Sequence, residues 1–317
     1  MTKLTTSLPP AIFLMGPTAS GKTGAVVALY EQLPVELISV DSALVFRDMD
    51  IGTAKPDAAT LALAPHHLID IIPPTAAYSA ANFRTDALAL MNDITARGKV
   101  PLMVGGTMLY FKALQEGLSG LPEADPSIRA QIDEAAAQSS WPAMHAKLAS
   151  IDPVTAARLK PNDMQRIQRA LEVHAITGKT MSALYAAQSA DTLPYRLLKI
   201  ALIPSERKVL HDRIALRFEQ MLEAGLVNEV KRLLANYPSL TPESTSMRCV
   251  GYRQVLEHLA GGYDTTELCD RGIFATRQLA KRQLTWLRGM EDTLSLDCLN
   301  PDLNSLIFTH INQFIND

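Results

Sequence analysis

The sequence predicts an α/β fold with a parallel sheet flanked by helices, and three observations support this. Short apolar runs alternate with helix-like stretches over the first third of the chain. A glycine-rich loop directly follows the first run and opens the first helical stretch. A further strand pattern returns near residue 195, after a region that reads as helical throughout. Strands that alternate with helices are typical of parallel sheets with right-handed crossovers.

The predicted strands are aliphatic or β-branched runs. They lie at 11–15, 35–40, 66–71, 99–104 and 195–203. Helices are expected over 22–32 and 79–97, where apolar residues recur at intervals of three and four. Another helical region is expected to begin at Ser205, as its N-cap, and to extend to Gly289. The tail beyond Asp292 has apolar periodicity and no motif that indicates a function.

We predict a discontinuous core with an inserted domain. Residues 1–120 and 195–317 would form a core like that of P-loop NTPases, with the C-terminal helices attached. Residues 121–194 would form an all-helical insertion, because alanine-rich stretches are broken there by prolines and no convincing strand occurs. A chain of 317 residues with 47% hydrophobic content is long and apolar enough for both parts.

Composition excludes several classes of protein. The formal net charge of −3 argues against a globally basic nucleic-acid coat, so any such contact must come from local clusters. No signal peptide and no run of about 20 apolar residues occurs, which predicts a cytoplasmic protein with no membrane partner. The cysteines Cys249, Cys269 and Cys298 lack C-x-x-C spacing, so we expect reduced thiols rather than disulfides or a zinc site.

The stretch GPTASGKT has the G-x-x-x-x-G-K-[ST] pattern of a phosphate-binding loop, often called an ATP-binding motif. Backbone N–H groups in such a loop point at an anion, and the helix that follows adds its positive N-terminal end. The loop predicts phosphate binding but does not imply a nucleotide. The residues expected at the phosphates are Gly16, Pro17, Thr18, Ala19, Ser20, Gly21, Lys22 and Thr23, of which Thr23 is placed to ligate Mg²⁺.

Two polar residues follow predicted strands and should emerge near the mouth of the loop. Asp41 could ligate Mg²⁺ or accept a proton from a nucleophile, or it could simply cap a helix. Thr107 follows two glycines that let backbone approach a ligand, although a turn or a cap explains it equally well. His66 and His67 are better explained as packed neutral side chains than as metal ligands.

Basic residues cluster on predicted helices, with Tyr252 and Trp286 among them. Each cluster alone is best explained as a solvated helix face. Together they resemble a surface for single-stranded or loop RNA, which combines backbone contacts with aromatic stacking. The clusters contain Arg166, Arg169, Arg248, Arg253, Arg277, Lys281, Arg282 and Arg288.

Nine segments resemble, in order and spacing, the bacterial tRNA dimethylallyltransferases. They cover about nine tenths of the chain and are together far more specific than the loop alone. The segments are GPTASGKT (16–23), SVDSALVFRDMDIGTAKP (39–56), HHLIDI (66–71), YSAANFRTDA (78–87), VGGTMLY (104–110), DPSIR (125–129), NDMQRIQRALEV (162–173), RCVGYRQ (248–254) and ATRQLAKRQLTWLR (275–288).

The resemblance implies transfer of a dimethylallyl group from dimethylallyl diphosphate to N6 of adenine 37, next to the tRNA anticodon. The loop would then hold the diphosphate of the donor, with Mg²⁺ on Thr23. Asp41 resembles the general base of this family, Thr107 its GGT threonine, and Arg217 a further arginine near the diphosphate. The partners implied are the donor and the tRNA anticodon stem-loop, and we expect a monomer.

The tRNA contacts implied by the resemblance lie in several separate segments. They are Asp41, Ser42, Ala43, Leu44, Thr107, Arg129, Gln165, Arg166, Ile167, Gln168, Arg169, Arg248, Cys249, Val250, Gly251, Tyr252, Arg253, Lys281, Arg282, Gln283, Leu284, Thr285, Trp286, Leu287 and Arg288. The insertion 121–194 would contact the anticodon arm. Many relatives have Arg-Gln where this chain has Ala43 and Leu44, and Tyr where it has Phe46. This chain therefore lacks the glutamine side chain that could contact a base at that position.

Three alternatives stay open from the sequence. A P-loop kinase or NTPase would use Asp41 as a metal ligand and turn over ATP without RNA. A non-catalytic tRNA-binding module could retain a vestigial loop, although Lys22 and Thr107 are intact. An enzyme that prenylates free adenine nucleotides would share the core, but it would not need the arginine-rich helix 275–288 or the insertion.

Overall fold

The computed structural model describes residues 8–117, 121–187 and 193–317. The chain divides into two compact units, one formed by Met1–Gln115 with Pro194–Asp317 and the other by Glu116–Leu193. Each unit has a hydrophobic core of its own. The stretch 118–120, just before the predicted insertion 121–194, and the stretch 188–192, near its end, lie outside the described residues.

A six-stranded parallel sheet forms the centre of the larger unit and confirms the predicted fold class. The spatial order β3-β2-β4-β1-β5-β6 places β1 between β4 and β5. Because all strands run the same way, their carboxyl ends meet at one edge, where ligands bind in open α/β sheets. The strands are β1 (Pro10–Met15), β2 (Val35–Val40), β3 (His66–His67), β4 (Val100–Gly105), β5 (Arg196–Ile203) and β6 (Leu294–Asp297).

Two strands differ from the prediction. The run at 66–71 gives only the two-residue β3, because Leu68 and Asp70 have φ values of 64° and 56°. Such left-handed backbone cannot continue a strand. The sequence did not indicate β6, which pairs with β5 at the sheet edge through Leu294, Leu296 and their neighbours. A four-residue strand is too short to stand out from helical periodicity.

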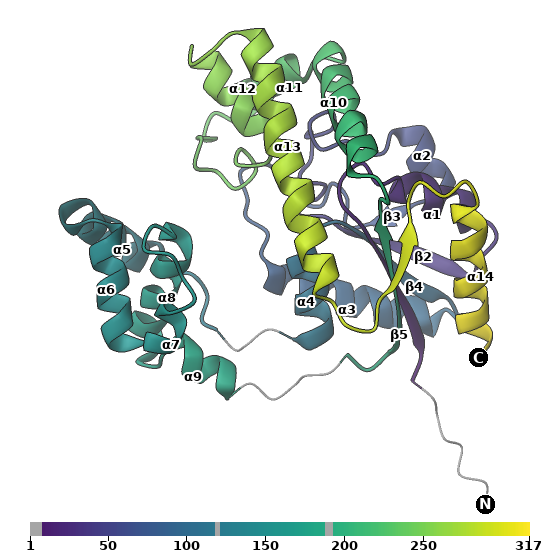
Figure 1. The fold of residues 1–317 in the computed structure, drawn as a ribbon, viewed down its shortest axis with the longest axis horizontal. Coiled ribbons are helices and arrows are strands. Elements are labelled where there is room, and N and C mark those ends of the chain that lie inside the picture. The colour runs from purple at the N-terminus through teal and green to yellow at the C-terminus, as the bar shows by residue number, and fades with distance from the viewer. Residues whose placement is uncertain (1–7, 118–120, 188–192) are drawn as a thin grey trace, which may run out of the picture. The chain divides into compact units, whose positions relative to one another are not determined.

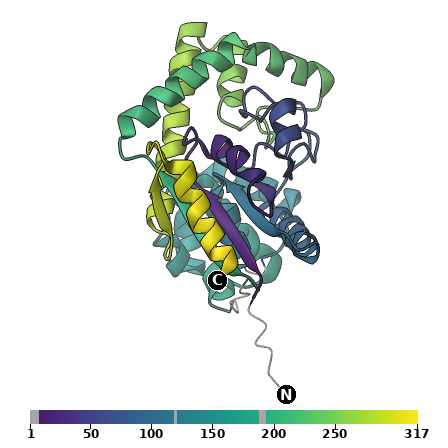
Figure 2. The same cartoon turned by 90° about the vertical axis from the view of Figure 1, so that its right-hand side faces the viewer.

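Alternate side chains of the central strand face opposite layers. Ile12 and Leu14 pack into a core with α1 (Lys22–Tyr30) and α14 (Leu303–Asn316), and Figure 2 shows α14 lying along the sheet. Phe13 points to the other face, where its ring lies 5.0 Å from that of Phe111 in α4 (Met108–Glu116). Because successive side chains of a strand point to opposite faces of the sheet, the residues of β1 alternate between the two helical layers.

Further helices complete the larger unit. Helix α3 begins after a capping box of Ser79 and Asn82 and contacts β2 and β4. Helices α10, α11, α12 and α13 gather beyond the carboxyl end of β5, where the long α13 packs on α10 (Figure 1). The further helices are α2 (Ala58–Leu63), α3 (Ala80–Ala96), α10 (Arg207–Glu223), α11 (Leu226–Asn236), α12 (Tyr252–Leu259) and α13 (Thr265–Arg288).

The start of α10 corrects one expectation. Its N-cap is Glu206 rather than Ser205, and no side-chain hydrogen bond caps the helix. The N–H of Ser205 donates instead to Oδ1 of Asp297, the last residue of β6, at 3.0 Å. Ser205 therefore ties the chain to the edge strand that the sequence did not reveal.

The smaller unit is entirely helical in its described part. Proline stands in the first turn of α5, α6 and α7, where its missing N–H costs no helical hydrogen bond. Asp125 and Asp152 cap α5 and α7 through their side chains. The helices are α5 (Pro126–Ser139), α6 (Trp141–Ile151), α7 (Pro153–Ala156), α8 (Met164–Thr177) and α9 (Met181–Ala186).

The surroundings of the three cysteines and of His66 and His67 fit structural roles. All three cysteines are free thiols, and burial raises the pKa of Cys249 to about 12, so this thiol is inert at neutral pH. His66 lies 2.7 Å from the carbonyl of Ala64, and burial lowers its pKa. His67 contacts Glu36. Within the described ranges, no helix is both long and apolar enough to cross a membrane.

Candidate functional site

The phosphate loop lies between β1 and α1. Gly21 has φ 85° at the N-cap of α1, a conformation that glycine adopts without strain. Among the described residues, the N–H groups of Gly21, Lys22 and Thr23 donate to no other backbone carbonyl. Free amides at a helix N-terminus form an anion-binding site, so the loop has the donors that phosphate oxygens require.

Lys22 lies across this loop. Its Nζ donates to the carbonyls of Gly16 and Pro17 at 2.9 and 2.7 Å. Its pKa is lowered to about 8, mainly because the side chain is buried, while Asp41 raises the pKa and Arg217 lowers it. An anion in the loop would favour the charged ammonium, so Lys22 is placed to respond to phosphate binding.

Asp41 follows β2 at the same edge of the sheet. Its Oδ1 accepts hydrogen bonds from the N–H groups of Ala43 and Leu44 at 2.8 and 3.4 Å. Asp41 therefore caps backbone N–H groups, as one alternative predicted, but it does so in a turn and not at the start of a helix. Burial raises the pKa of Asp41, against the opposing effects of these amides and of Lys22 and Arg217. Desolvation therefore prevails, and the carboxylate is a stronger base than an exposed aspartate.

Thr107 links the ends of β2 and β4. Its Oγ1 accepts a hydrogen bond from the N–H of Ser42 at 3.0 Å, and its own N–H donates to Val40 at 3.2 Å. A Cβ on Gly105 would lie 2.1 Å from the Val40 carbonyl, so only glycine permits this approach. Thr107 therefore takes part in a turn, and it also lies beside the segment that begins at Asp41.

Arg217 reaches the loop from α10. Its guanidinium donates to Oγ1 of Thr18, and burial lowers its pKa while Asp41 raises it. The structure thus brings Asp41, Lys22, Thr107 and Arg217 together at the carboxyl edge of the sheet. Two cations next to a phosphate loop and one half-buried carboxylate are groups that could serve transfer from a diphosphate ester.

The sequence did not indicate the group that holds the segment after Asp41. Glu229 on α11 is 2% exposed, and its carboxylate accepts hydrogen bonds from the N–H groups of Asp50, Ile51 and Gly52 at 2.8–3.1 Å. The hydroxyl of Tyr252 donates to it as well, at 2.6 Å. The sequence contains one sign that Glu229 is buried, because this residue lies on the apolar face of its helix, among Leu226, Val230 and Leu233.

Lys55 fixes the same segment from within. Its side chain is 4% exposed, and Nζ donates to the carbonyl of Phe46 at 3.0 Å and to Asp50 at 2.7 Å. It also pairs with Asp70, which follows β3. The chain from Asp41 to Lys55 is therefore held at several points.

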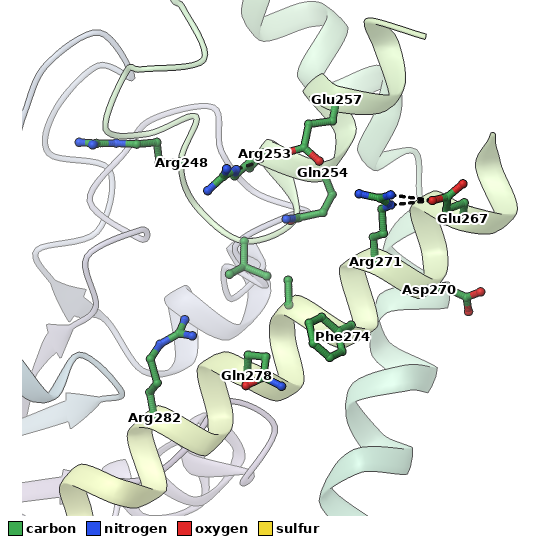
Figure 3. A pocket seen from close by; sticks show the side chains of 12 residues that line it. Arg248, Arg253, Gln254, Glu257, Glu267, Asp270, Arg271, Phe274, Gln278 and Arg282 are labelled. Carbon is green, nitrogen blue, oxygen red and sulfur yellow. Dashed lines mark hydrogen bonds and ion pairs between the residues drawn. The ribbon is translucent and has the colours of Figure 1, made fainter. Parts of the chain in front are cut away.

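A basic cleft of about 700 Å³ lies between α12 and α13 (Figure 3). Arg253 and Arg271 pair with Glu257 and Glu267, whereas no ion pair of Arg282 is present within the described chain. The exposed ring of Phe274 lies in the same cleft. The lining residues are Arg248, Val250, Arg253, Gln254, Glu257, Glu267, Asp270, Arg271, Phe274, Ala275, Gln278 and Arg282.

The residues predicted to contact RNA in this unit are partly exposed and partly buried. The exposed ones are Arg248, Arg253, Lys281, Arg282, Thr285, Trp286 and Arg288. The buried ones are Gly251, Tyr252, Gln283, Leu284 and Leu287. The structure contradicts the expectation that Tyr252 offers its ring for stacking, because that ring is 0% exposed and packs in a hydrophobic core.

In the smaller unit, buried Glu172 binds two of the predicted RNA contacts. It accepts hydrogen bonds from Arg129 at 2.8 and 3.1 Å and from Arg169 at 2.6 Å. Arg166 is exposed and forms a 3.4 Å ion pair with Asp163. Gln165 is exposed, Gln168 donates to Asp133, and Ile167 is buried in the core of the unit.

The expectation that the site binds Mg²⁺ depends on Thr23. The described residues contain no group of three or more His, Cys, Asp or Glu that could hold a metal ion. Magnesium at phosphate sites needs only one or two protein ligands, because substrate oxygens and water supply the others. The exposed Thr23 hydroxyl, in the first turn of α1, fits that kind of site.

The fold and the site define an α/β protein with a phosphate-binding loop and a half-buried carboxylate at the edge of its sheet. Residues 44–290 match the family described as IPP transferase. The chain belongs to this family.

Similar proteins match this chain over nearly its whole length. It is 65% identical over 310 residues to a tRNA dimethylallyltransferase of Methylobacillus flagellatus, with 98% of each chain covered. The solved structure of a tRNA isopentenylpyrophosphate transferase from Bacillus halodurans matches with TM-score 0.71 and 36% identity, over 97% of both chains. A eukaryotic dimethylallyltransferase acting on tRNA matches with TM-score 0.79 and 28% identity, covering 97% of this chain and 80% of the other.

Proposed function

We propose that this enzyme transfers a dimethylallyl group from dimethylallyl diphosphate to N6 of adenine 37 in tRNA, releasing diphosphate. One observation carries the proposal: the half-buried carboxylate of Asp41 lies within electrostatic reach of Lys22 and Arg217, beside a phosphate loop with free amides. The high identity to proteins named tRNA dimethylallyltransferase supports the same conclusion.

Departure of the leaving group depends on cations and on backbone amides. The allylic carbon is electrophilic only when the negative charge on the departing diphosphate is stabilised. Lys22, Arg217 and the amides at the start of α1 would bind its oxygens, and these donors are already in place before the reaction. Mg²⁺, held by Thr23 and the diphosphate, would supply further positive charge.

The nucleophile needs a base and a directed contact. The lone pair of an adenine amino group is delocalised into the ring, so the amine gains nucleophilicity as its proton leaves. Asp41 would accept this proton, and its raised pKa improves it for the task. The Thr107 hydroxyl would hydrogen-bond at the reacting centre. Adenine 37 must leave its stack to reach these groups.

The RNA would contact basic and polar surface residues of both units. In the larger unit we propose Arg248, Arg253, Lys281, Arg282, Trp286 and Arg288, all of which are exposed. In the helical unit we propose Gln165 and Arg166 as surface contacts, with Arg129 and Arg169 oriented by Glu172. We propose that the enzyme acts as a monomer. Because tRNA is cytoplasmic in bacteria, we place the enzyme there.

A transfer assay tests the proposal. Labelled dimethylallyl diphosphate and an anticodon stem-loop with adenine at position 37 should give a labelled RNA. Replacement of that adenine by guanine should abolish labelling. Specific ATP turnover without transfer to RNA would favour a kinase or NTPase instead, and preference for AMP over tRNA would favour a nucleotide prenyltransferase.

A further inference from the structure

Gln283 differs from its neighbours on α13. Lys281, Arg282 and Thr285 are exposed, whereas Gln283 is 9% exposed. Its Oε1 accepts a hydrogen bond from the N–H of Thr18 at 2.8 Å, and its Nε2 donates to the carbonyl of Gly106 at 2.9 Å. A backbone N–H can only donate and a carbonyl can only accept, so the orientation of the amide is unambiguous.

This amide joins two parts of the proposed site. Thr18 belongs to the phosphate loop, and Gly106 directly precedes Thr107 at the end of β4. The backbone of Gly106 lies close to both partners, because a Cβ there would be 2.5 Å from Nε2 of Gln283 and 3.3 Å from the carbonyl of Gly16. The bridge therefore sets the separation between the loop and the Thr107 turn.

The hydrogen bonds continue from this bridge to the proposed base. Thr107 accepts from the N–H of Ser42, which follows Asp41. On the other side of the bridge, Thr18 is held a second time, because Arg217 donates to its hydroxyl. The phosphate loop and the Asp41 turn are thus linked through one side chain of α13.

We propose that Gln283 is a positioning residue of the donor site, which holds the phosphate loop in register with Thr107, and that it does not contact RNA. The inference rests on the proposed function for the identity of the donor. A buried amide with both ends bonded inside the protein has little left to offer an RNA base. Loss of the bridge would remove the contact between Thr18 and Gly106, leave Thr18 held by Arg217 alone, and weaken the loop's hold on diphosphate.

The test replaces Gln283 by methionine, which has similar length and no amide. Inorganic pyrophosphate serves as the probe of the loop, measured by calorimetry, and an anticodon stem-loop serves as the probe of the RNA surface. For Gln283→Met we expect about tenfold weaker pyrophosphate binding. We also expect a raised KM for the donor and unchanged affinity for the stem-loop. Gln313→Met, the same change at an exposed position of α14, should alter none of these quantities.

Two results would overturn the inference. Weaker stem-loop binding with unchanged pyrophosphate affinity would make Gln283 an RNA contact. No change in either affinity would make the bridge dispensable. Failure of the wild-type enzyme to prenylate the stem-loop would instead contradict the proposed function, because pyrophosphate binding is measured without RNA or a prenyl group.

A second variant approaches the same bridge from the other side. Gly106→Ala would place its Cβ against Nε2 of Gln283 without changing α13. It should reproduce the selective loss of pyrophosphate affinity. Thermal unfolding of each variant, compared with Gln313→Met, separates this effect from a general loss of structure. A folded Gly106→Ala protein with wild-type pyrophosphate affinity would also count against the proposal.

Discussion

The hydroxyl of Tyr252 donates a 2.6 Å hydrogen bond to the carboxylate of Glu229, and both residues are buried. Tyr252 begins α12, within the RCVGYR segment, while Glu229 holds the backbone of residues 50–52. A Cβ on Gly52 would lie 2.5 Å from the Tyr252 ring, so this contact leaves no room for a side chain. The pair therefore joins a proposed RNA-binding segment to the segment that follows Asp41.

Replacement of Glu229 by glutamine should destabilise the larger unit by about 2–4 kcal/mol. Four donors converge on this carboxylate, and an amide NH₂ would face some of them with a further donor. Urea unfolding measures the change. Tyr252→Phe is the matched comparison, since it removes one donor and should cost about 1–2 kcal/mol. Equal stability of Glu229→Gln and wild type would show that the carboxylate is not needed.

Asp41→Asn should lower kcat by about 10²–10⁴-fold, the usual contribution of a general base. Its amide oxygen still accepts the hydrogen bonds from Ala43 and Leu44, so the turn is kept. Stem-loop affinity should change little, as measured by filter binding. An equally large loss of RNA affinity would move Asp41 from catalysis to binding.

The pH dependence of kcat/KM for the donor should be bell-shaped. Lys22 is charged below its pKa of about 8 and loses its proton as the pH rises through that value, so donor capture declines on the alkaline side. Asp41 must be ionised to accept a proton, and its raised pKa moves the acidic limb to higher pH than an ordinary aspartate would give. Lys22→Arg should shift the alkaline limb upward, since guanidinium stays charged. The same alkaline limb in both proteins would contradict this assignment.

Arg282→Ala should weaken stem-loop binding and reduce its salt dependence. Each lost phosphate contact lowers the slope of log K against log salt by about 0.7–0.9. The comparison is Lys208→Ala, which removes the same charge from an exposed position of α10 that pairs with Asp212. Identical salt slopes for the two variants would indicate that Arg282 does not contact phosphate.

Much of the larger unit followed from local patterns. The loop motif fixed the junction of β1 and α1, and apolar runs located β2, β4 and β5 within a residue or two. Local patterns failed where backbone conformation or pairing partners decided the outcome. Positive φ at Leu68 ended β3, and β6 forms only because β5 offers it an edge. Neither condition is visible in a short stretch of sequence.

The sequence by itself determined the chemistry: a phosphate loop, a carboxylate and a threonine at strand ends, and arginines along a helix. Parallel strands bring such residues to one edge, so their grouping could be expected. Only the tertiary structure decided which polar groups face inward. Glu229, Gln283 and Tyr252 are polar or aromatic residues in segments rich in surface side chains, yet each is buried with its polar atoms bonded. Glu229 and Gln283 form hydrogen bonds with partners 177–265 residues away in the sequence. No local pattern encodes a hydrogen bond between such distant groups.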